Sequence, residues 1–312
     1  MSAIFPLRFE TEAIAMEPVV TVGLDGSPES LDAARWAAED ASRRRYALRL
    51  MHAWVMLAED ENHAPSENEQ NYWAERIVHD AHAEVRKDHP DLPVIEELVA
   101  GQPLASLMRA LSESEMLVLG SRGMGTVEAF LLGDVSLGVV ARAERPVVLV
   151  RRGLHMAERS GSGRGRVVLG LDPQDSTDAL LEFAFSDAAA RGVPLEVVNA
   201  YHGHGIHRHR NGRNGRHKRN GNGEAAQQLA KEMQRRLDET VEPWREKFPG
   251  VEMIDTVRQE SPTKAMVHAA EGAELLIVGR RLHRAHRAAR IGNVAHAALH
   301  HAPCPVAVIP YD

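Results

Sequence analysis

The residue types best suited to chemistry form one spaced pattern: Gly120-Ser121-Arg122-Gly123, nine further residues, and then Gly133-Asp134-Val135-Ser136. Glycines let backbone amides approach an oxyanion closely, because no side chain stands between them. A helix predicted over 135–143 would direct the partial positive charge of its N-terminus at the same place. The pattern therefore predicts a phosphate site. It is not the phosphate loop that ends in Gly-Lys-Ser/Thr, because no lysine follows these glycines.

Short apolar runs and helical spacings supply the elements that must position this loop. The first part of the chain reads as strands at 18–25, 48–54, 94–100, 116–120 and 146–151, alternating with helices at 28–45, 73–87, 103–111 and 135–143. Strands that are nearly all apolar indicate a parallel sheet covered on both faces. Right-handed crossovers then give a doubly wound α/β domain. Ligands bind such sheets at the carboxyl ends of the strands, where Asp25 is placed to accept hydrogen bonds from ribose hydroxyls.

The same organisation occurs twice in the chain. Asp25 recurs as Asp172, 147 residues later, whereas Gly120 and Gly133 recur as Gly279 and Gly292, 159 residues later. A net insertion of 12 residues therefore lies within the second copy. A repeat of this length is a whole domain and not a solenoid unit. Strands of the second copy are expected near 166–172, 195–200, 251–257, 274–279 and 305–309.

These motifs, in this order and present twice, resemble the universal stress protein family. The resemblance covers most of the chain and rests on the spaced glycines, the Gly-Leu-Asp-Gly-Ser-Pro sequence at 23–28, the Gly-Gln-Pro sequence at 101–103 and the Pro-Val-Val-Leu-Val strand at 146–150. It implies two tandem Rossmann-like (adenine nucleotide alpha-hydrolase-like) α/β domains. Each would have a five-stranded parallel sheet of order 3-2-1-4-5. A subset of the family binds ATP, here with or without Mg²⁺.

The resemblance also implies which residues of the first copy would hold the nucleotide. By motif position, the base and ribose would contact Gly23, Leu24, Asp25 and Ala53. The ribose and phosphates would contact Gly120, Arg122, Gly123, Gly133, Val135 and Ser136.

Asp134 departs from the family pattern, which has Ser or Thr there. A hydroxyl can cap the helix and also donate to a phosphate, whereas a carboxylate only caps. An ionised Asp134 about 4 Å from a phosphate would oppose binding by roughly 4 kcal/mol at an effective dielectric of 20. Mg²⁺ or Arg122 would offset this repulsion. The alternative interpretation is that Asp134 is simply a helix cap and that phosphate binding is weakened.

The second copy predicts a degenerate site built from Asp172, Gly279, Arg280, Gly292 and Asn293. Leu282 replaces the second glycine, Ala295 stands where the first copy has Ser136, and Glu260 replaces Gly101. Five arginines at 280, 281, 284, 287 and 290 would still attract anions. Because a bulky side chain obstructs close backbone approach, we expect the nucleotide to bind mainly in the first domain.

The expected organisation is an N-terminal arm (1–17), a first domain (18–152), a linker (153–165) and a second domain (166–312) with a His/Arg-rich insertion at 201–223. Four histidines of the insertion are weak candidates for a Zn²⁺ or Ni²⁺ site: His202, His204, His207 and His209. The favoured interpretation of the insertion is a solvated loop, and no metal site is predicted in the domain cores.

Composition limits the class of protein. With 37 basic and 44 acidic side chains, the net charge of −7 argues against general nucleic-acid binding. A single cysteine, Cys304, excludes an intramolecular disulfide and fits a reducing cytoplasm. No apolar stretch is long enough to span a membrane.

These observations predict a cytoplasmic, nucleotide-responsive regulatory or protective module of the stress response, which binds ATP without needing to hydrolyse it. The resemblance also implies that the two domains pair, often through their last strands, and that a homodimer and an unidentified protein partner are expected. Two other functions stay open. One is a slow ATPase, for which the sequence nominates no residue that positions water. The other is a nucleotide-free interaction scaffold with decayed sites.

Overall fold

The computed structural model describes residues 17–55, 67–121, 133–152, 165–175, 178–201, 219–282 and 291–312. Most of the expected arm, linker and insertion lies outside these residues. So do Arg122, Gly123 and the four candidate histidines, His202, His204, His207 and His209.

The first copy alternates strands and helices as its apolar pattern predicted. Its elements are β1 (Val19–Leu24), α1 (Pro28–Arg44), β2 (Ala47–Trp54), α2 (Glu67–Asp88), β3 (Val94–Ala100), α3 (Pro103–Ser112), β4 (Met116–Ser121), α4 (Asp134–Arg142) and β5 (Val147–Arg151). The boundaries agree with the sequence to about one residue except in α2, which begins at Glu67 and not at residue 73. The first turns of α2 are polar, so they give no apolar periodicity to read.

The second copy repeats this order. Its elements are β6 (Arg166–Gly170), α5 (Asp178–Arg191), β7 (Leu195–Ala200), α6 (Arg219–Lys247), β8 (Met253–Arg258), α7 (Pro262–Ala269), β9 (Ala273–Arg281), α8 (Asn293–His301) and β10 (Val306–Tyr311). Helix α6 begins inside the stretch that the sequence assigned to the insertion, so residues 219–223 are helical.

Local chemistry explains why α1 begins and ends where it does. The hydroxyl of Ser27 caps the helix by accepting from the Ser30 amide at 3.1 Å, and Pro28 fixes the first helical residue. The buried face is built from small side chains, which let the helix lie close to the sheet: Ala33, Ala34, Ala37, Ala38 and Ala41. The helix stops at Arg45, which is left-handed with φ of 59°.

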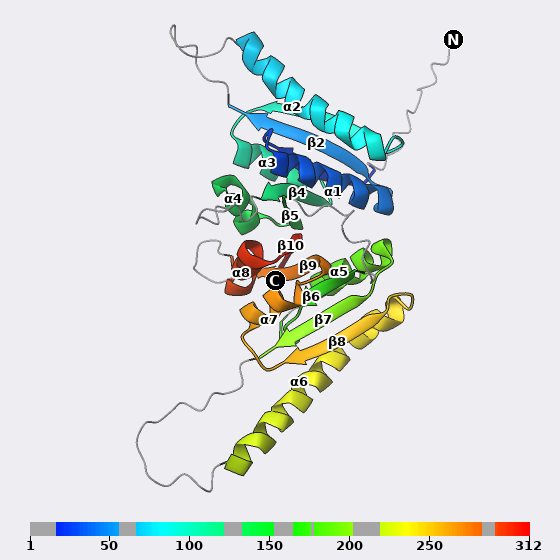
Figure 1. Cartoon of the computed structure of the whole chain (residues 1–312), viewed down its shortest axis with the longest axis vertical. Coiled ribbons are helices and arrows are strands. Elements are labelled where there is room, and N and C mark those ends of the chain that lie inside the picture. The colour runs from blue at the N-terminus through cyan, green and yellow to red at the C-terminus, as the bar shows by residue number, and fades with distance from the viewer. Residues whose placement is uncertain are drawn as a thin grey trace, which may run out of the picture.

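All ten strands form one sheet, in the order β3-β2-β1-β4-β5-β10-β9-β6-β7-β8. Each half has the predicted order 3-2-1-4-5 with parallel neighbours. The halves meet where β5 and β10 pair antiparallel, with Val148 opposite Ala307. These two residues are equivalent in the repeat, so the seam is a local twofold axis between the copies. Figure 1 shows the two halves stacked along the long axis of the molecule, with β5 and β10 at the centre.

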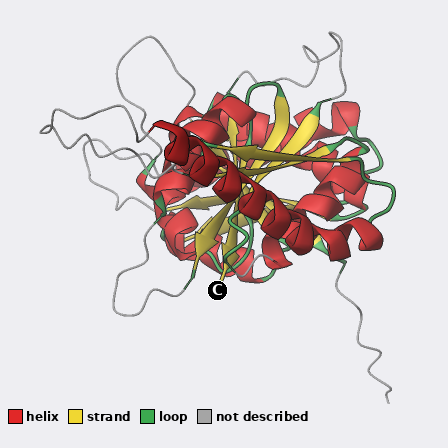
Figure 2. Cartoon of the chain, turned by 90° about the horizontal axis from the view of Figure 1, so that it is seen from below, coloured by secondary structure: helices red, strands yellow, loops and turns green. Residues whose placement is uncertain are grey.

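Helices cover both faces of this sheet (Figure 2). One buried apolar cluster lies under α1, α2, α5 and α6, and the other under α3, α4, α7 and α8. Each cluster includes residues of both copies, so both apolar layers continue across the seam. Within the described ranges, no helix is both long enough and apolar enough to cross a membrane.

Four buried charges join the copies on the face covered by α1 and α5. Arg44 donates to Asp40 in its own helix at 2.8 Å and to Asp187 of α5 at 2.5 Å. In the same way, Arg191 donates to Asp187 at 2.6 Å and to Asp40 at 2.7 Å. Asp40 and Arg44 are the repeat equivalents of Asp187 and Arg191, so this charge cluster obeys the local twofold. The side chains are 12% exposed in Arg44 and no more than 2% exposed in the other three.

Aromatic rings and the aspartates favour the charged forms of the two arginines, Arg44 and Arg191. The Arg191 guanidinium lies 5.1 Å from the centre of the Trp36 ring, and that of Arg44 lies 5.6 Å from the equivalent ring of Phe183. Burial alone lowers the pKa of Arg191, but Asp187 and Asp40 outweigh it and raise that pKa above its ordinary value. The cluster is therefore a paired network between the domains.

We expect Arg191→Met to lower the free energy of unfolding by about 3–5 kcal/mol, because Asp40 and Asp187 would then face each other with too little positive charge. Urea unfolding of the full chain measures this. Arg235→Met is the matched control, since Arg235 pairs with Glu232 and Glu239 on the exposed surface of α6 and its loss should change little. Equal unfolding midpoints for the two variants would contradict the role assigned to the cluster.

Candidate functional site

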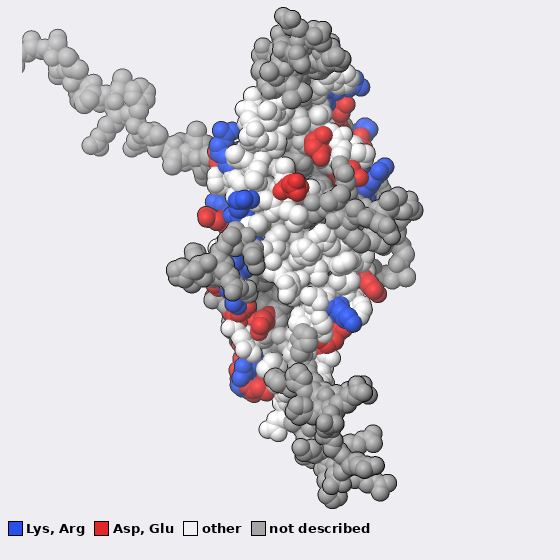
Figure 3. Space-filling view, turned by 90° about the vertical axis from the view of Figure 1, so that its left-hand side faces the viewer, with Lys and Arg blue, Asp and Glu red and all other residues white. Residues whose placement is uncertain are grey.

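A cavity of about 190 Å³ lies at the carboxyl ends of the central strands of the first copy. It is lined by Gly23, Leu24, Asp25, Ser30, Met51, Ala53, Pro103, Leu107, Leu119, Gly120, Val135 and Ser136. All of the predicted site residues that the structure describes line it, except Gly133 and Asp134. Figure 3 looks at the face that carries these strand ends, whose middle shows few acidic or basic side chains among the described residues.

Parallel register brings the lining residues of the strands together. Gly23 of β1 lies opposite Met51 of β2 on one side and opposite Leu119 of β4 on the other. A side chain at Gly23 would collide with Leu119, because its Cβ would stand 2.5 Å from that residue's Cδ2. Gly23 therefore leaves room for the side chain of Leu119, which forms part of the apolar wall of the cavity.

Gly120 is required by the packing of α1. A Cβ at this position would stand 2.5 to 2.6 Å from backbone atoms of Glu29 and Ser30, in the first turn of the helix. Backbone cannot yield as the end of a flexible side chain can. The sequence interpretation gave Gly120 a role in phosphate approach, and the structure adds a role in seating α1 over the end of β4.

Asp25 lies at the open edge of the cavity with an exposed carboxylate. Its Oδ1 accepts hydrogen bonds from the amide of Ser27 at 2.9 Å and from the Ser27 hydroxyl at 2.5 Å. Partial burial raises the pKa of Asp25, but the hydrogen bonds from Ser27 and Ser30 outweigh burial and hold this pKa below its usual value. Asp25 is therefore an ionised acceptor at neutral pH, as a ribose contact requires.

Ser30 is a lining residue that sequence reasoning missed. Its hydroxyl donates to the Ser27 carbonyl oxygen at 2.9 Å, and it lines the cavity because α1 starts there. The signal for it was the Ser-Pro-x-Ser sequence that opens the helix.

His52 lies at the edge of the core, near the end of β2. Its Nδ1 makes a hydrogen bond of 2.8 Å with the carbonyl oxygen of Leu24. In the second copy, Asn199 stands at the equivalent position and donates to the carbonyl oxygen of Leu171 at 2.9 Å. Both side chains hold the end of the first strand of their copy.

The helix start beside the cavity differs from its prediction. Gly133 occupies the cap position of α4, and Asp134 is the first residue inside the helix, exposed and away from the cavity lining. The interpretation of Asp134 as the cap is therefore wrong, because the chain turns into the helix one residue earlier. Asn293 of α8 is likewise preceded by a cap at Gly292. Negative charge in the first turn of a helix is favourable, which accounts for Asp134 in structural terms.

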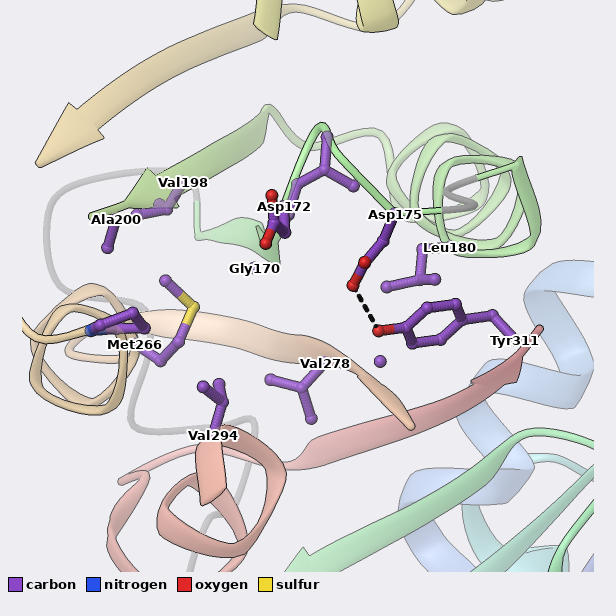
Figure 4. Close-up of a pocket in the computed structure, with 13 residues that line it drawn as sticks. Gly170, Asp172, Asp175, Leu180, Val198, Ala200, Met266, Val278, Val294 and Tyr311 are labelled. Carbon is purple, nitrogen blue, oxygen red and sulfur yellow. Dashed lines mark hydrogen bonds between the residues drawn. The ribbon is translucent and has the colours of Figure 1, made fainter. Parts of the chain in front are cut away.

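A second cavity, of about 230 Å³, occupies the equivalent place in the second copy (Figure 4). It is lined by Gly170, Leu171, Asp172, Asp175, Leu180, Val198, Ala200, Pro262, Met266, Val278, Gly279, Val294 and Tyr311. Of the residues predicted for this degenerate site, Asp172 and Gly279 line the cavity, whereas Arg280, Gly292 and Asn293 do not.

Arg280 belongs to the domain interface and not to the second site. It is only 4% exposed, and its guanidinium donates to the carbonyl oxygens of Ala141, at 3.1 Å, and of Ala143 at the end of α4. From the other copy, Arg151 donates to the carbonyl oxygen of Leu299 in α8 at 2.9 Å. Successive strand residues point to opposite faces, so the neighbour of a cavity glycine faces away from the cavity. The prediction of Arg280 as an anion ligand is therefore wrong.

Metal binding finds no support within the described part of the chain. No group of three or more His, Cys, Asp or Glu side chains there could hold a metal ion. Cys304 is buried in the apolar cluster under α7 and α8.

Comparison with known proteins gives one consistent result. The model of the universal stress protein family matches residues 18–151 and 163–310. A universal stress protein of Mycobacterium tuberculosis H37Rv is 30% identical over 305 residues, which cover 93% of this chain and 96% of the relative. One from Mycolicibacterium smegmatis is 28% identical over 314 residues, with coverages of 95% and 98%. A solved universal stress protein from Archaeoglobus fulgidus has the same fold, with a TM-score of 0.68, 17% identity and coverages of 94% and 98%.

We expect Gly120→Ala to destabilise the protein by about 1–3 kcal/mol, because the added methyl group must displace the first turn of α1. The free energy of unfolding from denaturant titration measures this. Gly250→Ala is the control, since a Cβ at Gly250 meets no atom within 4 Å. If both variants lose the same stability, the contact between Gly120 and α1 is not a constraint.

Proposed function

Because the chain belongs to the universal stress protein family in both of its copies, we propose that its first domain binds an adenine nucleotide. One observation carries the proposal: residues at the nucleotide-motif positions, far apart in sequence, line a single cavity at the carboxyl ends of β1, β2 and β4. This edge of a doubly wound sheet is where ligands bind in such folds.

The cavity has the chemistry that a base and a ribose require. Apolar side chains of Met51, Ala53 and Leu107 offer a surface for a planar base. Asp25 lies on the same lining and, as an ionised acceptor, suits the hydroxyls of a ribose. A ligand with an apolar ring and a hydroxylated sugar fits both features.

The start of α4 suits the phosphates. The first helical hydrogen bond of α4 runs from the Leu137 amide to the Gly133 carbonyl oxygen at 3.0 Å. The amides that precede it, those of Asp134, Val135 and Ser136, lie at the positive end of the helix and beside the cavity. The Ser136 hydroxyl, which lines the cavity, adds a donor.

Binding by itself gives a regulatory mechanism. A nucleotide in this cavity would touch β1, β4 and α4 at once, so occupancy favours the arrangement in which these elements lie together. A partner that contacts this edge of the sheet would then sense nucleotide level. The proposal is a nucleotide-responsive module of the stress response, and hydrolysis is not part of it.

We expect calorimetric titration of the full chain with ATP and Mg²⁺ to show one binding site. We expect Ala53→Trp to lower the affinity for ATP at least about tenfold, because the larger side chain fills the cavity. Ala200→Trp is the matched control, because Ala200 holds the equivalent position in the second cavity. Absence of binding at millimolar ATP, or equal loss in both variants, would overturn the proposal.

We expect Asp134→Ser to raise ATP affinity only about fivefold. The Asp134 carboxylate is exposed. Its repulsion of a phosphate 4 Å away is therefore about 1 kcal/mol, as for two charges in water, and not the larger energy of a partly buried pair. The same titration compares ATP with adenosine, whose affinity should not change. A gain of a hundredfold or more would show that Asp134 faces the phosphates directly.

A further inference from the structure

We propose that the second copy holds a binding site for an uncharged nucleoside-like ligand, because its cavity retains the base and sugar end of the first site, with Asp172, but adds a second carboxylate, Asp175, and Tyr311 where charge would have to fit. This site is separate from the nucleotide site proposed for the first domain and does not depend on it.

The retained end of the cavity is nearly identical in position to that of the first copy. Ten of its lining residues stand at repeat positions that also line the first cavity: Gly170, Leu171, Asp172, Val198, Ala200, Pro262, Met266, Val278, Gly279 and Val294. Only the apolar types differ, as with Met266 for Leu107. A planar ring therefore meets the same kind of surface here as in the first copy.

The other end has been rebuilt around Gly279. In the first copy, the start of α1 lies over the equivalent glycine, Gly120. In the second copy, the ring of Tyr311 lies over Gly279. A Cβ on Gly279 would stand 2.5 Å from Tyr311 Cε1 and 2.9 Å from Leu180 Cδ2. Figure 4 shows Tyr311, Leu180 and Asp175 at one end of the cavity and Met266 and Ala200 at the other.

The polar atoms at this rebuilt end are engaged with one another. The Tyr311 hydroxyl donates to Asp175 Oδ2 at 2.8 Å, and Arg281 donates to Asp175 Oδ1. The Arg281 guanidinium also lies 5.8 Å from the centre of the Tyr311 ring. Burial and the Asp175 carboxylate raise the pKa of Tyr311 to about 12, so its hydroxyl stays a donor to Asp175 at neutral pH. Arg281 is thus committed to Asp175 and Tyr311.

Among the charged side chains that the structure describes in the cavity lining, what remains for a ligand is the acceptor capacity of two carboxylates. Asp172 and Asp175 both line the cavity, and the Asp172 Oδ1 accepts only a backbone amide, that of Gln174 at 3.1 Å, among the bonds described. Two carboxylates favour a ligand that brings hydroxyl or amino donors and disfavour one that brings a phosphate. A neutral nucleoside has such donors and the right ring, whereas its phosphate esters add repulsion.

The test uses the full chain with Ala53→Trp, which blocks the first cavity, and titrates adenosine and AMP by calorimetry. We expect one adenosine per chain and at least about tenfold weaker binding of AMP. Adding Ala200→Trp should abolish adenosine binding. Thermal unfolding of each variant shows whether it is folded, and if Ala53→Trp is not, the unmodified chain serves: it should bind adenosine in both copies but ATP in one.

A charge-neutralising variant tests the stated cause of the preference. Asp175→Asn keeps the shape of the side chain, removes the negative charge and releases Arg281, so AMP should bind at least about fivefold better relative to adenosine. Asp172→Asn, at the retained end, should lower the affinity for adenosine itself. No adenosine binding in the Ala53→Trp chain, equal affinity for AMP, or a preference unchanged by Asp175→Asn would each overturn the proposal. Loss of ATP binding alone would contradict only the nucleotide site proposed for the first domain.

Discussion

Four charges buried between α1 and α5 link the two domains, and each of these charges depends on the other copy for part of its pairing. Each arginine binds an aspartate of its own helix and an aspartate of the other copy. A charge taken out of water must be fully paired, or it destabilises the fold strongly. Neither domain alone would supply all of these partners, so the second domain completes the buried network of the first. The pairing of β5 with β10 lies between the two domains and joins their sheets into a single ten-stranded sheet.

The same two helices connect this cluster to the cavities. The first turn of α1 lies over Gly120 beside the first cavity, and its last turns carry Asp40 and Arg44. In α5, Leu180 lines the second cavity, and Asp187 and Arg191 follow toward the other end of the helix. A shift of either helix at the domain interface would therefore change the shape of a cavity.

Both copies keep the backbone that forms the cavity, but the side chains at one end of the cavity differ between them. Tyr311, at the end of the last strand, lies over Gly279 in the second copy. Leu282 follows the end of β9 where the first copy has its second motif glycine, and its amide donates to the Tyr311 carbonyl oxygen at 2.7 Å. The strand pairing at the end of β10 thus places the tyrosine over Gly279. These differences in one loop and one strand end underlie the proposed preference of the second cavity for an uncharged ligand.

The sequence by itself determined the fold class and the repeat, because apolar runs, helix starts and glycine spacing are local signals. The strand order and most of the first cavity lining were implied by the resemblance to the universal stress protein family, and parallel register brings those lining residues to one edge of the sheet. The sequence did not determine the partners of Asp40 and Arg44, the direction of Arg280, or the place of Tyr311. Those depend on how elements more than a hundred residues apart pack across the seam. Only the tertiary structure decides which buried charge meets which, because side chains far apart in sequence have no fixed distance until the sheet and helices are in place.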